Sequence, residues 1–181
     1  MNPANKATLL RIILIPLFII CFYLPIPQAH HIAAILFILA SLTDVWDGWY
    51  ARKHNLVTDF GKLMDPMADK LLICTAFIML LGAGKIHPVF VVLFIGRELI
   101  ISAFRLVAAQ KQTVIAAGVL GKIKTTLQCV AVVFLLLDNP IFGKIGIPMD
   151  QILVWVAAVF TVWSCADYLI RNRKVVNLRD C

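Results

Sequence analysis

The sequence predicts an all-α integral membrane protein with six transmembrane helices. Hydrophobic residues make up 61% of the 181 residues and charged residues only 15%, which is far outside the range of a soluble domain. Several apolar runs have the roughly 20-residue length that a helix needs to cross about 30 Å of hydrocarbon. The runs do not alternate polar and apolar residues as strands do, so we expect every span to be a helix.

Pro, Gly, His or charged residues lie at most of the junctions between the apolar runs. The first run is long for a signal peptide and has no small-x-small cleavage site before His30, so we expect it to stay as a mature helix. Because the spans use most of the chain, residues 1–181 are predicted to form a single domain. The expected spans are residues 8–24, 31–51, 62–82, 87–110, 119–138 and 149–170.

The basic residues predict the orientation of these spans. Of the 17 Lys and Arg residues, only Lys85 and Lys144 fall in the loops after the third and fifth spans, and the loop LPIPQAHH after the first span has none. Short loops rich in Lys and Arg stay in the cytoplasm, so both termini are expected there. The net charge of +7 follows from this asymmetry and suits anionic headgroups, so no nucleic-acid partner is expected.

Aspartates gather where the second span ends and the third begins. Asp44 and Asp47 are three residues apart, and helical periodicity places Gly48 and Ala51 on the same face. Early in the third span, a second face carries three residues spaced four apart, namely Gly61, Asp65 and Asp69. The two carboxylate pairs lie on neighbouring antiparallel helices, so we expect them to converge.

Such a cluster is costly unless something binds it. An Asp in hydrocarbon costs about 2.5–3.5 kcal/mol, so four unpaired ones would cost on the order of 10 kcal/mol. Pairing of Lys62 with Asp65, or solvated interfacial positions, would offset part of this cost. Converging carboxylates without matching cations instead describe a site for hard divalent cations. A small cation transporter is the alternative, although the outer halves of the spans carry no acidic or polar trail.

These residues fill a known pattern. The chain reads DxxDGxxAR and, eight residues later, GxxxDxxxD, from Asp44 to Asp69. This pattern resembles the signature of the CDP-alcohol phosphotransferases. Three further segments, NPANKATLLR, IGRELIISAFR and GKIKTT, resemble the bacterial phosphatidylglycerophosphate synthase branch of that family. The likeness runs from Asn5 to about the end of the last span.

The resemblance implies a reaction and a setting. The phosphatidyl group of CDP-diacylglycerol would pass to sn-glycerol 3-phosphate, releasing phosphatidylglycerophosphate and CMP, the first committed step toward phosphatidylglycerol and cardiolipin. The enzyme would be a homodimer among the lipids of the bacterial cytoplasmic (inner) membrane, with its active site facing the cytoplasm. Inositol phosphate, inositol or serine are alternative acceptors.

The resemblance also implies site residues. Two divalent cations, Mg²⁺ or Mn²⁺, would bridge Asp44, Asp47, Asp65 and Asp69 and hold the diphosphate, and Asp69 would be the general base. The nucleotide and diphosphate would contact Asn5, Thr8, Asp47, Gly48, Ala51, Arg52 and Gly61.

A phosphate-bearing acceptor needs a second, basic site. The candidates are Arg97, Arg105, Lys122 and Lys124. The alternative for Arg105 is an ion pair with Glu98, because a spacing of seven residues places both on one helix face. Pro66 has two interpretations: it kinks the third span and helps to aim Asp65, or it is the first residue of that helix.

Overall fold

The computed structural model describes residues 3–53, 59–110, 118–139 and 142–173, and within these ranges every regular element is a helix. Side chains are described for residues 10, 12–43, 67–68, 70–110, 118–139, 142–143 and 145–173. The elements are α1 (Pro3–Phe22), α2 (Ala29–Lys53), α3 (Asp59–Gly82), α4 (Pro88–Gln110), α5 (Val119–Leu136), the 3-10 helix η1 (Gly143–Ile145) and α6 (Met149–Arg171).

These bounds confirm the predicted all-α architecture with six long helices. The helix ends differ from the predicted ends by a few residues. The second interpretation of Pro66 is wrong, because α3 begins at Asp59 and Pro66 lies inside the helix. The side chain of Pro66 is outside the described set, so its effect on the direction of Asp65 stays a prediction.

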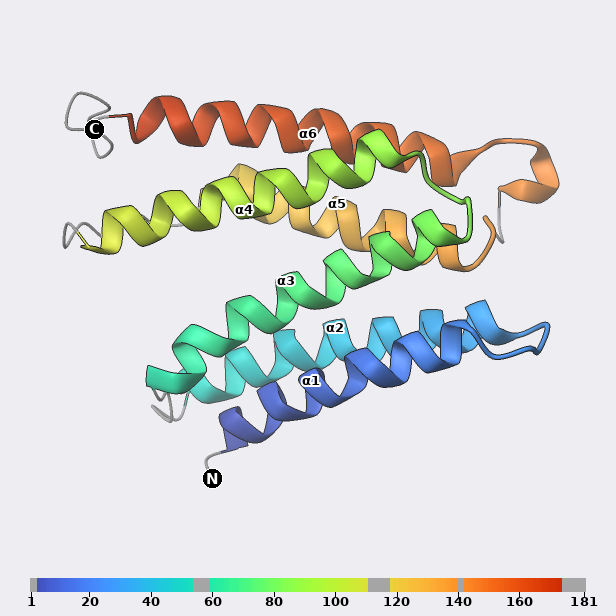
Figure 1. Cartoon of the computed structure of the whole chain (residues 1–181), viewed down its shortest axis with the longest axis horizontal. Coiled ribbons are helices and arrows are strands. Elements are labelled where there is room, and N and C mark those ends of the chain that lie inside the picture. Colours follow the sequence, from blue (N-terminus) through green and yellow to red (C-terminus); the bar gives the residue numbers. More distant parts are fainter. Residues whose placement is uncertain (1–2, 54–58, 111–117, 140–141, 174–181) are drawn as a thin grey trace.

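Successive helices run in opposite directions, so the start of α1 and the end of α6 lie at the same end of the bundle (Figure 1). We call this the terminal end; α3 and α5 begin there and α2, α4 and α6 end there. Helix α5 packs against α2, α3 and α6, while α1 packs against α2 and α3, and α4 packs against α3 and α6. Residues from four of the six helices, α5 and its three partners, can therefore meet around α5.

The core combines small and aromatic side chains. Ala34, Ala76, Ala131 and Ala157 are fully buried, and their small size lets neighbouring helices approach closely. Aromatic contacts fill the wider gaps, and the rings of Phe77 on α3 and Phe94 on α4 have centroids 4.7 Å apart. This packing fixes α3 against α4, which matters for the site described below.

The outer surface is rich in apolar side chains, with Val92 71% and Val119 73% exposed. Among the described residues, two helices are long and apolar enough to cross a membrane, Val119–Leu136 and Met149–Arg171. Shorter apolar helical segments cover Ile12–Phe22, Ala29–Thr43 and Lys70–Gly82. These features indicate that the protein associates with a membrane.

At the end of the bundle opposite the termini, polar contacts join three connections between helices. Lys85 Nζ lies 2.7 Å from Asp138 Oδ1 and 3.0 Å from His30 Nδ1, and it donates a hydrogen bond to Leu135 O at 3.2 Å. Asp138 adopts a left-handed conformation, with φ of 54°, which turns the chain just after α5. One lysine therefore ties together the starts or ends of α2, α4 and α5.

His30 belongs to this cluster as a neutral group. Burial, followed by the charge of Lys85, lowers the pKa of His30 below its usual value, although Asp138 opposes the shift. The folded chain thus favours the neutral imidazole, which accepts a hydrogen bond from Lys85. The stability from this group is present above the ordinary histidine pKa and is lost as the pH falls through the lowered pKa.

Replacing Lys85 by Met is expected to lower the melting temperature in detergent at pH 7.5, where His30 is neutral. Lys85 is mostly buried but its partner Asp138 is 62% exposed, so we expect a loss of about 1 kcal/mol, or about 2–4 °C. The control is Arg173→Met, which removes an exposed cation. Equal melting temperatures for the two variants would show that the Lys85 contacts add nothing to stability.

Candidate functional site

The helices bring the predicted aspartates to the same part of the bundle. Asp44 and Asp47 lie in the last turns of α2, Asp65 and Asp69 lie in the first half of α3, and both of these segments are at the terminal end (Figure 1). The predicted nucleotide-binding residues lie at this end too, in the first turns of α1, the end of α2 and the start of α3. The side chains of all these residues are outside the described set: Asn5, Thr8, Asp44, Asp47, Gly48, Ala51, Arg52, Gly61, Asp65 and Asp69.

The predicted metal site depends on the chemistry of its carboxylate donors. The side chains that the structure describes contain no group of three or more His, Cys, Asp or Glu residues that could hold a metal ion. The four aspartates are not among those side chains, so this finding does not bear on them. Four carboxylates on two helices joined by a short connection are a donor set that fits hard divalent cations.

A second site lies within the described residues, where side chains from α4 and α5 meet. Glu98 Oε1 on α4 forms ion pairs with Lys124 Nζ on α5 and, at 3.2 Å, with Arg97 Nη1. Lys124 is only 1% exposed, so its charge is paired inside the protein rather than solvated. Among the described residues, Glu98 forms ion pairs with Arg97 and Lys124, and not with Arg105, the partner that the sequence had left open.

Helix α6 completes one side of this site. Arg97 Nη2 donates a hydrogen bond to Ser164 Oγ at 3.3 Å, and Ser164 Oγ in turn donates to Thr161 O at 3.1 Å. Gly121 on α5 lies beside the same guanidinium. A β-carbon at Gly121 would lie 3.8 Å from Arg97 Nη2, which is an ordinary van der Waals contact. Arg97 is thus held by contacts from two directions.

Several buried donors in this region have no partner within the described residues. They are Arg97 Nε, Arg105 Nε and the hydroxyl of Tyr168. Tyr168 is only 7% exposed, and Arg105 Cζ lies 5.7 Å from the centre of its ring. A buried donor without an acceptor costs about 1–3 kcal/mol, so three of them in one region indicate a place for a ligand rich in acceptor oxygens.

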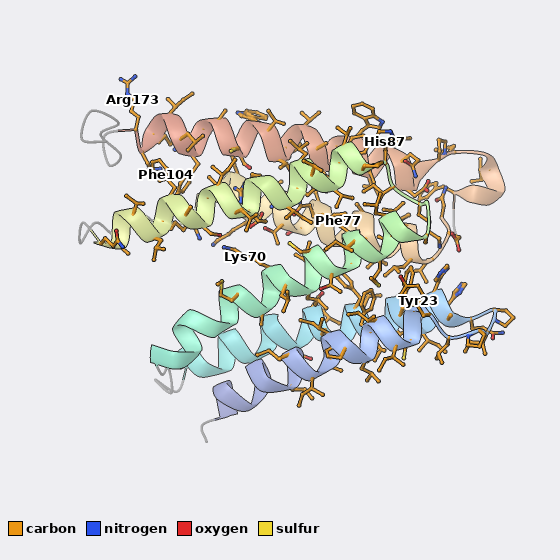
Figure 2. The ribbon with its side chains drawn as sticks, viewed as in Figure 1. Tyr23, Lys70, Phe77, His87, Phe104 and Arg173 are labelled. Carbon is orange, nitrogen blue, oxygen red and sulfur yellow. The ribbon has the colours of Figure 1, made fainter. Side chains whose placement is uncertain are left out.

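Lys70 brings α3 into the same region. Its Nζ donates a hydrogen bond to Ser102 Oγ on α4 at 2.6 Å, and Ser102 Oγ donates to Glu98 O at 2.5 Å. Figure 2 shows Lys70 in the space between α3 and α4. Lys70 was not among the acceptor residues predicted from the sequence. The available signal was a cation inside an apolar helix, directly after Asp69.

The structure brings three of the four predicted acceptor residues together and leaves one outside. Arg97, Arg105 and Lys124 lie in the cluster described above, whereas Lys122 is exposed near the start of α5. Ser164 and Tyr168 were also missed, and the sequence carries no clear signal for them because Ser and Tyr are ordinary residues in an apolar helix.

The charges make this cluster suited to anions. The four cations Lys70, Arg97, Arg105 and Lys124 face one described carboxylate, Glu98, which leaves a formal charge of +3. Arginine offers a planar fork that matches the oxygens of a phosphate or carboxylate. We call these four cations together with Tyr168 the basic cluster. Its geometry and charge fit a phosphate monoester.

Known proteins resemble the chain along nearly its whole length. The model of the CDP-alcohol phosphatidyltransferase family matches residues 1–163. A Bacillus subtilis (strain 168) protein named CDP-diacylglycerol–glycerol-3-phosphate 3-phosphatidyltransferase is 46% identical over 94% of this chain and 95% of its own length. Proteins of the same name are 40% identical in Rickettsia felis, over 96% of both chains, and 43% identical in Shigella flexneri serotype 5b, over 95% of both. The chain therefore belongs to the CDP-alcohol phosphatidyltransferase family.

Proposed function

We propose that this chain is a membrane-embedded phosphotransferase that moves the phosphatidyl group of CDP-diacylglycerol to glycerol 3-phosphate and releases CMP. The relatives at 40–46% identity carry the name of this reaction. The observation that carries the choice of acceptor is the basic cluster, which combines excess positive charge with buried donors that have no partner among the described residues. A neutral acceptor would leave those charges and donors uncompensated.

The proposed setting is the inner membrane of a bacterium, with the terminal end in the cytoplasm. The apolar outer surface and the two long apolar helices support membrane embedding. The chain's Lys and Arg residues are concentrated in segments at the terminal end, which supports a cytoplasmic position for that end. Glycerol 3-phosphate would then enter from the cytoplasm, and CMP would leave to the same side. A homodimer is part of the proposal by family likeness.

In this proposal the two substrates occupy neighbouring places at the terminal half of the bundle. The phosphate of glycerol 3-phosphate binds the basic cluster, with Arg97 and Arg105 facing its oxygens. The diphosphate of CDP-diacylglycerol binds at the end of α2 and the start of α3, where Arg52 supplies a further cation. Asp44, Asp47, Asp65 and Asp69 would hold two divalent cations, Mg²⁺ or Mn²⁺, which neutralise the diphosphate charge and polarise the phosphorus when they are bound.

The proposed chemistry needs one base. Asp69 takes the proton from the primary hydroxyl of glycerol 3-phosphate. The hydroxyl oxygen forms a bond to the phosphorus that carries diacylglycerol, and the bond from that phosphorus to the CMP oxygen breaks in line. Since Asp69 lies on α3, which packs directly against α4, the packing of these two helices sets the distance from the base to the acceptor.

The experiment is an acceptor comparison. Purified protein in detergent with Mg²⁺ and CDP-diacylglycerol is expected to release CMP when given glycerol 3-phosphate, and not when given serine or inositol. The readout is CMP formation with identification of the lipid product. Inositol phosphate is tested as a fourth acceptor. CMP release with inositol phosphate but not with glycerol 3-phosphate would keep the reaction class and replace the acceptor. Release with serine or inositol would contradict the role of the basic cluster.

A further inference from the structure

We propose that Lys70 is a specificity-determining residue that binds the acceptor's phosphate together with Arg97 and Arg105 and holds the acceptor at a fixed distance from Asp69. This inference rests on the proposed function, because it takes a phosphate-bearing acceptor as given. The supporting observation is that Lys70 on α3 donates a hydrogen bond to the hydroxyl of Ser102 on α4, in a region that holds several other cations.

The partner of Lys70 is chemically unusual for a half-buried ammonium group. The hydroxyl of Ser102 uses its only proton to bond Glu98 O at 2.5 Å, so its oxygen accepts the bond from Lys70 Nζ at 2.6 Å. Ser102 fixes the position of the ammonium group without neutralising it. An ammonium group has three donors, and within the described side chains no carboxylate lies within ion-pair distance of Lys70.

Among the described residues, most charged groups near Lys70 are also positive. Arg105, Arg97 and Lys124 lie near enough for their charges to repel that of Lys70. Glu98, the described carboxylate of the region, is already bound to Arg97 and Lys124. Cations gathered in this way repel one another unless an anion lies between them, and a phosphate monoester with up to two negative charges meets that need.

Lys70 differs from the other three cations in the helix that carries it. Arg97 and Arg105 lie on α4 and Lys124 lies on α5, whereas Lys70 lies on α3 directly after Asp69. A phosphate bound to Lys70 is therefore anchored to the helix of the proposed base as well as to α4. This anchoring would select acceptors in which a phosphate and a hydroxyl are separated by a set distance, and it would disfavour neutral polyols.

The alternative is that Lys70 only links α3 to α4 as a structural hydrogen bond. A structural link would affect thermal stability and both substrates alike. A phosphate contact would affect the acceptor alone. The two roles can be separated by comparing binding of the acceptor, binding of CDP-diacylglycerol and melting temperature in the same variants.

The test uses the variants Lys70→Met, which keeps much of the length and removes the charge, Lys70→Gln, which keeps a hydrogen-bond donor, and Lys70→Arg, which keeps the charge. We expect Met and Gln to raise the KM for glycerol 3-phosphate about tenfold, with the KM for CDP-diacylglycerol unchanged and with Arg restoring most of the loss. Glycerol 3-phosphate without CDP-diacylglycerol should raise the melting temperature of the wild type, and the half-saturating concentration should rise about tenfold in the Met variant. Arg173→Met, which removes an exposed cation at the end of α6, is the control (Figure 2).

The outcomes separate the inference from the proposed function. If Lys70→Met and Lys70→Gln keep the wild-type KM for glycerol 3-phosphate while Arg97→Ala raises it, the inference is wrong and the proposed function stands. If both variants lower the melting temperature and raise both KM values equally, Lys70 is structural and the inference is again wrong. If the wild type neither binds nor uses glycerol 3-phosphate, the proposed acceptor fails and the inference fails with it.

Discussion

Replacing Asp69 by Asn is expected to lower the kcat for CMP release by about 10²- to 10⁴-fold, the range that a positioned general base supplies. The amide keeps the shape of the side chain but cannot take a proton from the acceptor hydroxyl. Since Asp69 is also a proposed metal ligand, the rate should be measured at saturating Mg²⁺. Binding of CDP-diacylglycerol, measured separately, should persist.

Asp167→Asn is a suitable control for this experiment. Asp167 on α6 forms an i, i+4 ion pair with Arg171, whose side chain is 73% exposed, and this pair lies apart from the proposed chemistry. The control should retain wild-type turnover. Turnover of the Asp69→Asn protein close to the wild-type value would exclude Asp69 as the base, and a full loss of CDP-diacylglycerol binding would assign it to metal or substrate binding alone.

Replacing Arg97 by Ala is expected to raise the KM for glycerol 3-phosphate about 10- to 150-fold. This range corresponds to losing a charged hydrogen bond of about 1.5–3 kcal/mol. Arg97 is held by Glu98 and Ser164, and its buried Nε has no described partner, so the guanidinium is positioned in advance for an anion. Glu98 keeps its ion pair with Lys124 in the variant, which limits the structural damage.

The Arg97 prediction has a matched control and a conservative variant. Arg171→Ala removes an exposed guanidinium from the same end of the bundle and should leave the KM unchanged. Arg97→Lys should recover part of the affinity, because a lysine restores the charge but not the planar fork. A change in the KM for CDP-diacylglycerol that equals the change for glycerol 3-phosphate would contradict a role for Arg97 in the acceptor site.

The helices could be predicted from the sequence because their signals are local. Apolar runs of sufficient length, bounded by Pro, Gly, His or charge, predicted six helices, and the described part of the chain forms six long helices in nearly the same places. The start of α3 was harder to place. Charged residues, Gly61 and Pro66 lie just before the apolar run, and such residues often mark the start of a helix. They are also tolerated inside one, and α3 includes them because it begins at Asp59.

The acceptor site was only partly predictable because it depends on contacts between helices. Arg97, Arg105 and Lys124 stand out as cations in apolar helices, and the structure gathers them. Lys122 carries the same signal two residues before Lys124, yet it is exposed while Lys124 is buried. A difference of two residues turns a side chain about 200° around a helix, and only the packing of α5 decides which of the two faces inward.

The sequence by itself determined the all-α class of this protein, its long helices and the family signature from Asp44 to Asp69, because composition, periodicity and motif spacing are properties of consecutive residues. The tertiary structure alone decided that Glu98 pairs with Arg97 and Lys124, that Tyr168 and Ser164 line the same region, and that Lys70 reaches from α3 to α4. These contacts join residues far apart in the chain, and they depend on the rotation and depth of each helix against its neighbours, which no local pattern encodes.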